Sequence, residues 1–420
     1  MRRVRAVTIP SRQVTGRNRF CDIASEVSVP QRILIVKLSS LGDVIHTLPA
    51  AQALRRKFPN AHLAWAVERA HAGVLRNQEC IDEVIEWNRG TWRSFASFIA
   101  RLRSQTWDLA IDFQGLFRSG FVTRASGAKR RIGYAPTRER AHWFYNERIT
   151  APTEAMHAVE KSLRLLEPLG ATLPGVPLLR SYLGSNSQLL QLNSPGPKSG
   201  AGERATVRRG AHDAAGNLLF PLSIHNAERS AVEGWLGAHR FDASRQRLVI
   251  LNPHCRKPAN IWPAERYSQL AARLLEQPGI RVAVSGGPVA RELCDEIAAP
   301  LGDRLWRADG MFSLLGSAEL IRRASLFVTG DTGPMHIAAA VGAPIVALFG
   351  PADPLKTGPY TTDAVVLTKQ LPCAPCFAKQ CPLGHRPAKC MTDISVDDAF
   401  AAALGILEAE TTTRPQRISA

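Results

Sequence analysis

The chain has 420 residues, which is more than one domain of usual size accommodates, and its 45% hydrophobic and 21% charged composition is typical of a soluble globular protein. Its net charge of +17 indicates an anionic partner, either nucleic acid, an anionic membrane surface or an acidic substrate, but does not choose among them. No run of about 18 apolar residues occurs, so we expect no membrane-spanning helix.

Residues 1–30 contain six arginines and lack the continuous apolar stretch of a signal peptide. We expect a flexible basic extension there. Residues 32–37 form a β-branched run that predicts a buried parallel strand, and residues 49–58 continue in a helical pattern. The loop between them ends at Asp43. Asp43 is either the N-cap of the following helix or a carboxylate that takes part in chemistry.

Two further strands are predicted at residues 61–67 and 107–113, separated by helix-like stretches, so residues 31–183 describe a Rossmann-like half. The half carries many basic residues. Their simplest interpretation is solvated surface charge, and the alternative is a site for an acidic ligand. These basic residues are Arg89, Arg93, Arg118, Lys129, Arg130, Arg131, Arg138 and Arg140.

Residues 184–218 are rich in Ser, Gly, Pro and Arg with little periodicity, which predicts a disordered linker or insertion. A second half, residues 219–395, follows with a helix near 227–239. Its predicted strands at 248–253 and 282–288 both end in loop-forming residues. Residues 396–410 form an amphipathic last helix, and residues 411–420 a tail.

Residues 328–340 predict a buried strand, a turn and an Ala-rich helix. The turn, residues 331–334, has two interpretations: free backbone N–H groups at the helix start form an anion site, or Asp331 or Thr332 only caps the helix. Residues 342–354 add the next strand and a Gly/Pro loop, which completes a βαβ unit. Ligands of such sheets bind beyond the carboxyl ends of the strands, where Asp331, Thr332, His336 and Gly350 would lie.

The chain has eight cysteines, a sparse number that indicates a reducing, cytoplasmic compartment. Four of them, Cys373, Cys376, Cys381 and Cys390, fall within one short segment. A Cys-x2-Cys pair with two more cysteines is compatible with a structural metal, but a second Cys-x2-Cys pair is absent. We expect no metal, with this segment as the minor alternative.

Two motifs, KLSSLGDVIHTLP at residues 37–49 and DTGPMH at 331–336 followed by FGP at 349–351, resemble those of the bacterial ADP-heptose:lipopolysaccharide heptosyltransferases. The first is most similar to the motif of heptosyltransferase I, and the resemblance covers residues 31–180 and 245–400. It implies an α/β fold of the GT-B type, with two Rossmann-like domains facing an interdomain cleft and a last helix that packs back on the first domain.

The resemblance also implies an activity. The enzyme would be an inverting glycosyltransferase that moves heptose from ADP-L-glycero-D-manno-heptose to a Kdo-lipid A type acceptor in lipopolysaccharide inner-core synthesis. It would work in the cytoplasm, in peripheral contact with the anionic inner membrane, without nucleic acid and without a cofactor.

Site residues follow from the same resemblance. Asp43 is the implied general base, which takes the proton of the acceptor hydroxyl. Donor-binding residues are implied to be Asn252, Arg256, Lys257, Glu292, Phe312, Asp331, Thr332, Gly333, Pro334 and His336. Acceptor-binding residues, among which arginine forks suit carboxylate and phosphate, are implied to be Ser40, Gly42, Arg93, Gln114, Arg118 and Arg138.

Two positions depart from the family pattern. Asn260 stands where relatives usually carry a lysine, two residues before a Trp-Pro pair, and Ala290 stands where an acidic residue often binds the ribose. Arg256 or Lys257 would then replace the missing charge, and Glu292 follows Ala290 by two residues. These departures leave open a transferase for another nucleotide sugar. A non-catalytic basic module that binds nucleic acid or membrane rests on charge alone, since no nucleic-acid motif is present.

Overall fold

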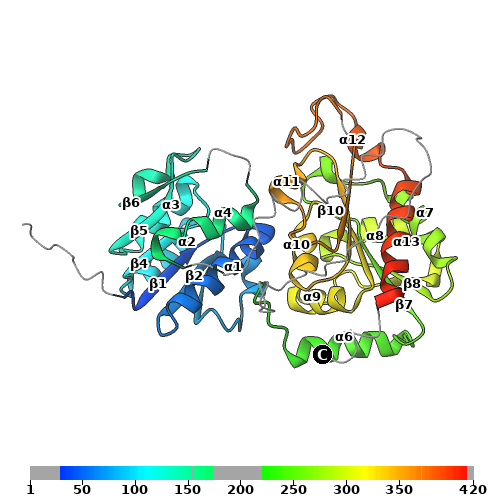
Figure 1. Ribbon diagram of the computed structural model, residues 1–420, viewed down its shortest axis with the longest axis horizontal. Helices are drawn as coiled ribbons and strands as arrows, with labels where there is room; N and C mark the ends of the chain where they lie inside the picture. Colours follow the sequence, from blue (N-terminus) through cyan, green and yellow to red (C-terminus); the bar gives the residue numbers. More distant parts are fainter. Residues whose placement is uncertain (1–28, 153–155, 172, 174–219, 370, 414–420) are drawn as a thin grey trace, which may run out of the picture.

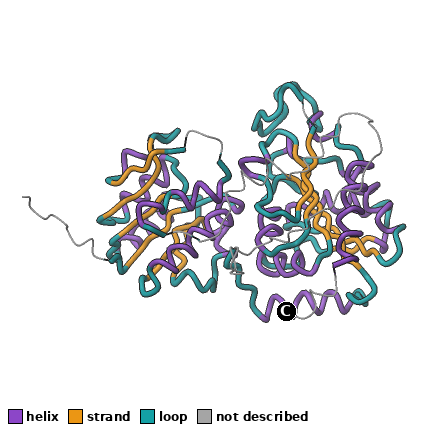
Figure 2. The backbone as a smooth tube through the Cα atoms, in the orientation of Figure 1, coloured by secondary structure: helices purple, strands orange, loops and turns teal. Residues whose placement is uncertain are grey.

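The structure is a computed structural model that describes residues 29–152, 156–171, 173, 220–369 and 371–413. Most of the expected N-terminal extension, the expected 184–218 insertion and residues 414–420 of the expected tail lie outside these ranges. The described residues form two α/β halves placed side by side (Figures 1 and 2). The expected α/β architecture with two halves is therefore confirmed.

The first half is built on a parallel six-stranded sheet with the order β3-β2-β1-β4-β5-β6. The sequence predicts only β1, β2 and β4, because the other three strands begin with charged residues that interrupt the apolar pattern. The strands are β1 (Arg32–Val36), β2 (His62–Glu68), β3 (Glu83–Trp87), β4 (Leu109–Asp112), β5 (Arg130–Ala135) and β6 (Glu147–Thr150).

Helices cover both faces of this sheet, and β1 shows the reason. Its Ile33 and Ile35 enter the core shared with α1, while Leu34 and Val36 enter the core beneath α2 and α3, since successive side chains of a strand point to opposite faces. The helices are α1 (Leu41–Lys57), α2 (Trp92–Arg103), α3 (Phe117–Ala125) and α4 (Ala158–Arg164), with 3₁₀ turns η1 (Arg69–Val74), η2 (Ala141–Phe144) and η3 (Glu167–Leu169).

The second half repeats this plan with a parallel sheet of the order β12-β11-β10-β7-β8-β9. Its strands are β7 (Arg247–Asn252), β8 (Ile280–Val284), β9 (Leu305–Arg307), β10 (Leu326–Gly330), β11 (Ile345–Phe349) and β12 (Ala364–Thr368). Its helices are α6 (Asn226–Ala238), α7 (Ala264–Leu275), α8 (Arg291–Ala298), α9 (Leu314–Arg323), α10 (Gly333–Ala340), α11 (Pro354–Thr357), α12 (Lys389–Thr392) and α13 (Val396–Thr413), with 3₁₀ turns η4 (Pro258–Asn260), η5 (Pro288–Ala290) and η6 (Gly302–Arg304).

The last helix, α13, packs on the second half, against α7 and the strands β10, β11 and β12. Its buried residues Ala399, Ala403 and Leu407 belong to the same core as Trp262. The resemblance implied packing against the first half. This expectation is wrong, because the contacts of α13 named above are all with elements of the second half. The helix also runs to Thr413, three residues past the expected end at 410.

The two halves meet where α1 packs against α10. A Cβ atom added to Gly42 would lie 2.4 Å from Cδ2 of His336, and one added to Gly333 would lie 2.7 Å from Cδ2 of Leu41. Glycine at both positions lets the two helices approach this closely. Because Leu41 and Gly333 are the first residues of α1 and α10, the beginnings of both helices share one junction. No helix among the described residues is long and apolar enough to cross a bilayer.

Candidate active site

The loop between β1 and α1 holds Asp43 by a capping box. Ser40 is the N-cap of α1, and Asp43 is the third residue of the helix. Oδ2 of Asp43 accepts hydrogen bonds from the backbone N–H of Ser40 at 2.9 Å and from its hydroxyl at 2.8 Å. The alternative in which Asp43 is itself the N-cap is wrong, because the helix begins two residues earlier, at Leu41.

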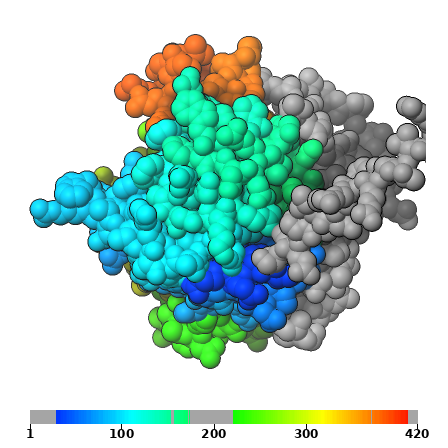
Figure 3. All heavy atoms as spheres, turned by 90° about the vertical axis from the view of Figure 1, so that its left-hand side faces the viewer, coloured from blue at the N-terminus to red at the C-terminus, as the bar shows by residue number. Residues whose placement is uncertain are grey.

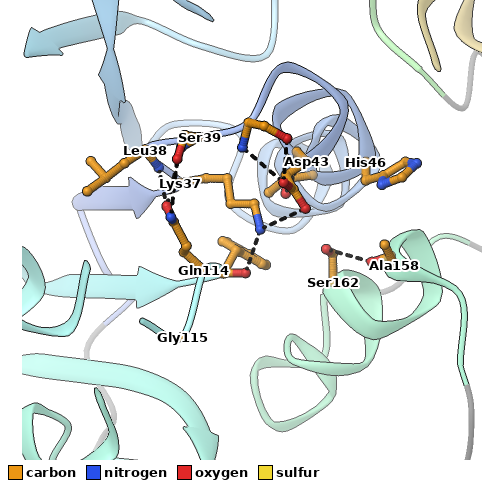
Figure 4. Close-up of polar contacts among 12 residues, drawn as sticks. Lys37, Leu38, Ser39, Asp43, His46, Gln114, Gly115, Ala158 and Ser162 are labelled. Atoms are coloured by element: carbon orange, nitrogen blue, oxygen red, sulfur yellow. Dashed lines mark hydrogen bonds and ion pairs between the residues drawn. The ribbon is translucent and has the colours of Figure 1, made fainter. Parts of the chain in front are cut away.

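The charge of Asp43 is balanced by Lys37, which directly follows β1. Its Nζ lies 3.7 Å from Oδ1 of Asp43 and donates to the carbonyl oxygen of Phe113 at 3.0 Å (Figure 4). Burial acts to raise the pKa of Asp43, but Lys37 and the hydrogen bonds from Ser40 outweigh this effect and hold the pKa below its usual value. The side chain remains 46% exposed. Asp43 is thus an accessible carboxylate, ionised at neutral pH, that can accept a proton.

Gln114, expected at the acceptor site, holds the loop in front of Asp43. Its Oε1 accepts from the backbone N–H groups of Leu38 at 2.8 Å and Ser39 at 3.3 Å. Its own backbone N–H donates to Oδ1 of the buried Asp112 at 2.8 Å. The structure therefore gives Gln114 a positioning role in the loop that carries Ser40 and leads into Asp43, and Figure 4 shows it beside Lys37.

The three arginines expected at the acceptor site differ in their environment. Arg118 forms an ion pair with the nearly buried Glu68, with 2.8 Å between Nη2 and Oε1, and its guanidinium lies 5.1 Å from the centre of the Trp87 ring. Arg93 and Arg138 are exposed and form no ion pair with another described residue. Arg93 and Arg138 can therefore bind an anion directly, whereas Arg118 already neutralises an internal carboxylate.

The expected anion-binding turn follows β10 and opens α10. Thr332 is the N-cap, and its Oγ1 accepts from the N–H of Met335 at 3.4 Å. Asn252, at the end of β7, donates to Oγ1 of Thr329 at 3.0 Å and of Thr332 at 3.4 Å. The capping interpretation therefore holds for Thr332. It does not exclude an anion site, because Thr332 bonds the N–H of Met335 and leaves the N–H of Gly333 free, while Pro334 has none.

Asp331 lies in the same turn and has mixed surroundings. Burial raises its pKa, while Lys257 and a hydrogen bond from Nδ2 of Asn260, 3.2 Å from Oδ2, act against the rise. Asn260 is only 2% exposed. A lysine at this position would have to bury its charge, so in this chain Lys257 supplies the positive charge beside the turn.

Arg256, the other basic residue of this loop, points its charge toward the first half. Burial lowers the pKa of His71 in η1, Glu68 opposes the change, and Arg256 adds to the lowering. Arg256 is exposed. Lys257 thus places positive charge beside Asp331, and Arg256 places it near His71 of the first half.

The remaining donor candidates lie on the loops after β8 and β9. Glu292 is exposed in the first turn of α8, whereas Ala290, the position of the expected acidic residue, is fully buried. Glu292 is therefore the accessible carboxylate of this loop. Phe312 is half-buried, with its ring centre 6.1 Å from that of Trp235.

His336 lies on α10 as expected, but its ring faces α1. Its Nδ1 is 2.9 Å from Nε2 of His46. His157, the N-cap of α4, lies against His46 with 5.1 Å between ring centres. Sequence reasoning missed His46 and His157, because a single histidine in an apolar helical segment carries no signal for a partner 290 positions away.

The cysteine segment surrounds a cavity of about 170 Å³ lined by Cys373, Cys376, Cys381, Cys390 and His385, with apolar neighbours. Among the described residues, no group of three or more His, Cys, Asp or Glu side chains is arranged to hold a metal ion. Each described cysteine is free. The expectation that the protein needs no metal stays a prediction.

A model of glycosyltransferase family 9 (heptosyltransferase) matches residues 95–386. This chain belongs to glycosyltransferase family 9. The lipopolysaccharide heptosyltransferase 1 of Pseudomonas aeruginosa is 30% identical over 364 residues, covering 83% of this chain and 87% of that protein. The Escherichia coli lipopolysaccharide heptosyltransferase 1 is 27% identical over 350 residues, covering 80% of this chain and 92% of that protein. The expected glycosyltransferase activity is thus confirmed, and the non-catalytic alternative is set aside.

Solved structures agree on the fold. A family 9 glycosyltransferase of Veillonella parvula superposes with a TM-score of 0.69 at 23% identity, over 90% of this chain and 97% of that chain. The Escherichia coli ADP-heptose lipopolysaccharide heptosyltransferase II gives 0.66 at 22% identity, over 90% and 99%. The expected GT-B-type fold is confirmed. The roles of individual site residues stay predictions.

Proposed function

We propose that this family 9 enzyme transfers heptose from ADP-L-glycero-D-manno-heptose to a Kdo-lipid A type acceptor in lipopolysaccharide inner-core synthesis, with inversion at the anomeric carbon. The observation that carries the proposal is the shared junction of α1 and α10, which sets the ionised Asp43 beside the turn of Asp331 and Thr332. The heptosyltransferase 1 relatives, which match most of their own length, support the choice of donor and acceptor class.

In this reaction Asp43 accepts the proton of the acceptor hydroxyl while the hydroxyl oxygen bonds to the anomeric carbon. The bond from that carbon to the diphosphate oxygen breaks at the same centre, and ADP leaves with the electron pair. Because attack and departure take place on opposite faces, the configuration inverts. Holding both substrates at one junction supplies much of the acceleration, since correct orientation alone is worth about 7–11 kcal/mol in favourable cases.

The departing diphosphate carries the charge that the second half must stabilise. The free N–H of Gly333 at the start of α10 and the side chain of Lys257 provide positive potential there, and Arg256 adds positive charge on the same loop as Lys257. Asp331 orients the turn or binds a sugar hydroxyl, and Glu292 binds the ribose. This arrangement requires no metal.

The acceptor binds the first half, next to exposed aromatic and basic side chains on α2, α3 and η2. Trp92 is 77% exposed and Trp143 is 58% exposed. Arg140 lies over the Trp143 ring at 5.1 Å. Figure 3 shows the surface of this half, coloured blue to green. Aromatic and basic side chains together suit the interface of an anionic membrane. We call this surface the aromatic–basic face; it comprises Trp92, Arg93, Phe117, Phe121, Arg138, Arg140 and Trp143.

The aromatic–basic face supports a location of the enzyme at a membrane surface. Arg93 and Arg138 bind the carboxylate and phosphates of the acceptor, while the aromatic side chains enter the lipid interface. The enzyme then acts at the cytoplasmic surface of the inner membrane, in peripheral contact with it.

Two observations favour a second candidate donor, a nucleotide sugar other than ADP-heptose. Asn260 is buried and bonded to Asp331, and Ala290 is buried, so neither offers the contact that relatives usually provide to the nucleotide sugar. A family 9 transferase with these residues could use another nucleotide sugar.

A donor panel with the full chain tests the choice. Purified enzyme is assayed with a Kdo-lipid A acceptor and ADP-heptose, and in parallel with other ADP- and UDP-sugars, and the anomeric configuration of the product is read by NMR. We expect transfer from ADP-heptose with inversion. Faster transfer from a different nucleotide sugar, or retention of configuration, would overturn the proposed reaction.

A further inference from the structure

A pair of buried histidines joins the two helices that carry the proposed reaction. His46 on α1 is 3% exposed, His336 on α10 is 6% exposed, and their ring nitrogens lie 2.9 Å apart. The rings meet edge to face, with 4.1 Å between centres and 70° between planes. At this distance one nitrogen donates and the other accepts, so the contact is a direct hydrogen bond between the first and second halves.

A third histidine makes a second bond across the junction. Nδ1 of His157 accepts from the N–H of Val159 at 3.2 Å, which leaves Nε2 as the N–H that donates to the carbonyl oxygen of Gly358 at 3.1 Å. His157 is therefore neutral with one defined tautomer. Its ring also lies 4.8 Å from that of Tyr360 in the second half. His157 packs against His46, so the two bonds form one buried cluster.

The residues next to this cluster restrict how α1 and α10 can move relative to each other. Gly42, one residue before Asp43, is the position at which any Cβ would meet the His336 ring. His46 lies one helical turn after Asp43 and therefore moves with it, while His336 lies one turn after Gly333 and moves with the donor turn. A change in the His46–His336 contact must then change the separation between Asp43 and the turn.

We propose that the His46–His336 hydrogen bond, supported by His157, is a latch that fixes the distance between Asp43 and the donor turn. Both histidines are positioning residues, and His336 acts on α1 rather than on the donor. Their role in transfer rests on the proposed function, whereas their role in joining the two halves does not.

Two kinds of variant test the latch in the full chain. His46→Leu and His336→Leu remove the hydrogen bond but keep apolar volume. His46→Gln and His336→Asn restore it, because the Gln amide reaches the position of Nε2 and the Asn amide that of Nδ1. His62→Leu is the matched control, since the His62 ring contacts Glu83 at 3.3 Å and lies 6.4 Å from the Trp107 ring, both within the first half.

The latch predicts that loss of the hydrogen bond lowers kcat and leaves ADP binding unchanged. His46→Leu should lower kcat about 10- to 100-fold, the size expected when reacting groups are displaced by about 1 Å, with the Kd for ADP unchanged. His46→Gln should recover most of the kcat, and His62→Leu should match the wild type. If His46→Leu keeps its kcat, or if His336→Leu weakens ADP binding as much as it lowers kcat, His336 is a donor contact and the latch is wrong.

A second measurement does not depend on activity. The midpoint of urea unfolding is recorded for His46→Leu, His336→Leu and the double variant. We expect the double variant to lose clearly less than the sum of the single losses, since each change breaks the same bond. Strict additivity would overturn the latch even if transfer is seen. Coupling in a protein that transfers no heptose would leave the latch standing and reject only the proposed function.

Discussion

The ammonium nitrogen of Lys37 lies 3.7 Å from Oδ1 of Asp43 and thereby sets the character of the proposed base. Lys37 is 8% exposed, so its charge requires a partner, and Asp43 provides one. The lowered pKa keeps Asp43 deprotonated at physiological pH but makes it a weaker base. Such a carboxylate suits a reaction in which the hydroxyl becomes acidic only as its oxygen bonds to the anomeric carbon.

Gly333→Ala tests the donor turn. The new Cβ would lie 2.7 Å from Cδ2 and 3.1 Å from Cβ of Leu41, so Leu41 and the start of α10 must move apart, and the N–H of Gly333 moves with the helix. Forced displacements of this kind cost about 1–3 kcal/mol, and we therefore expect ADP affinity measured by calorimetry to fall about tenfold. Gly234→Ala on α6 is the control, because nothing lies within 4 Å of its added Cβ. Equal affinity in the two variants would place the nucleotide elsewhere.

Replacing the arginines of the first half should have two different effects, one on the acceptor KM and one on stability. Arg93→Ala and Arg138→Ala should raise the KM for the acceptor without changing stability, because both side chains are exposed. Arg118→Ala should instead lower the free energy of unfolding by about 2 kcal/mol, since Glu68 loses its nearer partner and keeps the more distant Arg89, at 4.0 Å. Adding Glu68→Gln to Arg118→Ala should restore stability. If Arg118→Ala raises the KM for the acceptor and leaves stability unchanged, Arg118 binds the acceptor directly.

The buried histidines should make stability depend on pH. Burial is the main cause that lowers the pKa of His336 to about 3 and of His157 to about 4, against an ordinary 6.5. Below pH 6.5 the unfolded chain binds protons that the folded chain does not, so the free energy of unfolding falls as the pH decreases toward 4. Each histidine contributes up to about 1.4 kcal/mol per pH unit.

Urea unfolding between pH 7.5 and 5 measures this slope. Asp43 and Lys37 lie near the cluster and are kept in every variant, so their contribution is constant. His336→Asn should show a shallower fall with decreasing pH than the wild type. The same slope in both proteins would show that His336 is not a buried neutral side chain.

Metal analysis tests the cysteine segment. Protein purified without chelator should contain well below one zinc or iron per chain, and Cys373→Ser with Cys376→Ser should leave transfer intact. The reason is that Cys373 and Cys376 are exposed and line a cavity whose walls include neither Asp43 nor a residue of the donor turn. One tightly held metal per chain, with unfolding on chelation, would make this segment a structural metal site.

Much of the fold follows from local patterns in the sequence. The unit β10, turn and α10 is predicted closely, because a buried strand, a capped turn and an Ala-rich helix each leave their own signal. The basic residues at the start of β5 predict solvated surface charge rather than a strand. The structure pairs Arg130 with Glu147 of β6 at 2.6 Å, and a charged pair between neighbouring strands looks like surface in a single sequence.

The site is predictable only in part. Asp43 and the turn of Asp331 stand out because each follows a buried strand at the carboxyl edge of a sheet. The pairing of Arg118 with Glu68 and the bond between His46 and His336 do not stand out. Both depend on the packing of elements far apart in the chain, and for the histidines on how the two halves meet.

Asp43→Asn tests the central claim most directly. The amide keeps the size of the side chain and can still accept from Ser40, but it cannot take a proton. Transfer from ADP-heptose to the Kdo-lipid acceptor and ADP binding are measured on the same preparation. We expect kcat to fall by about 10²–10⁴-fold with ADP affinity unchanged. Activity within about tenfold of the wild type would contradict the assignment of Asp43 as the general base.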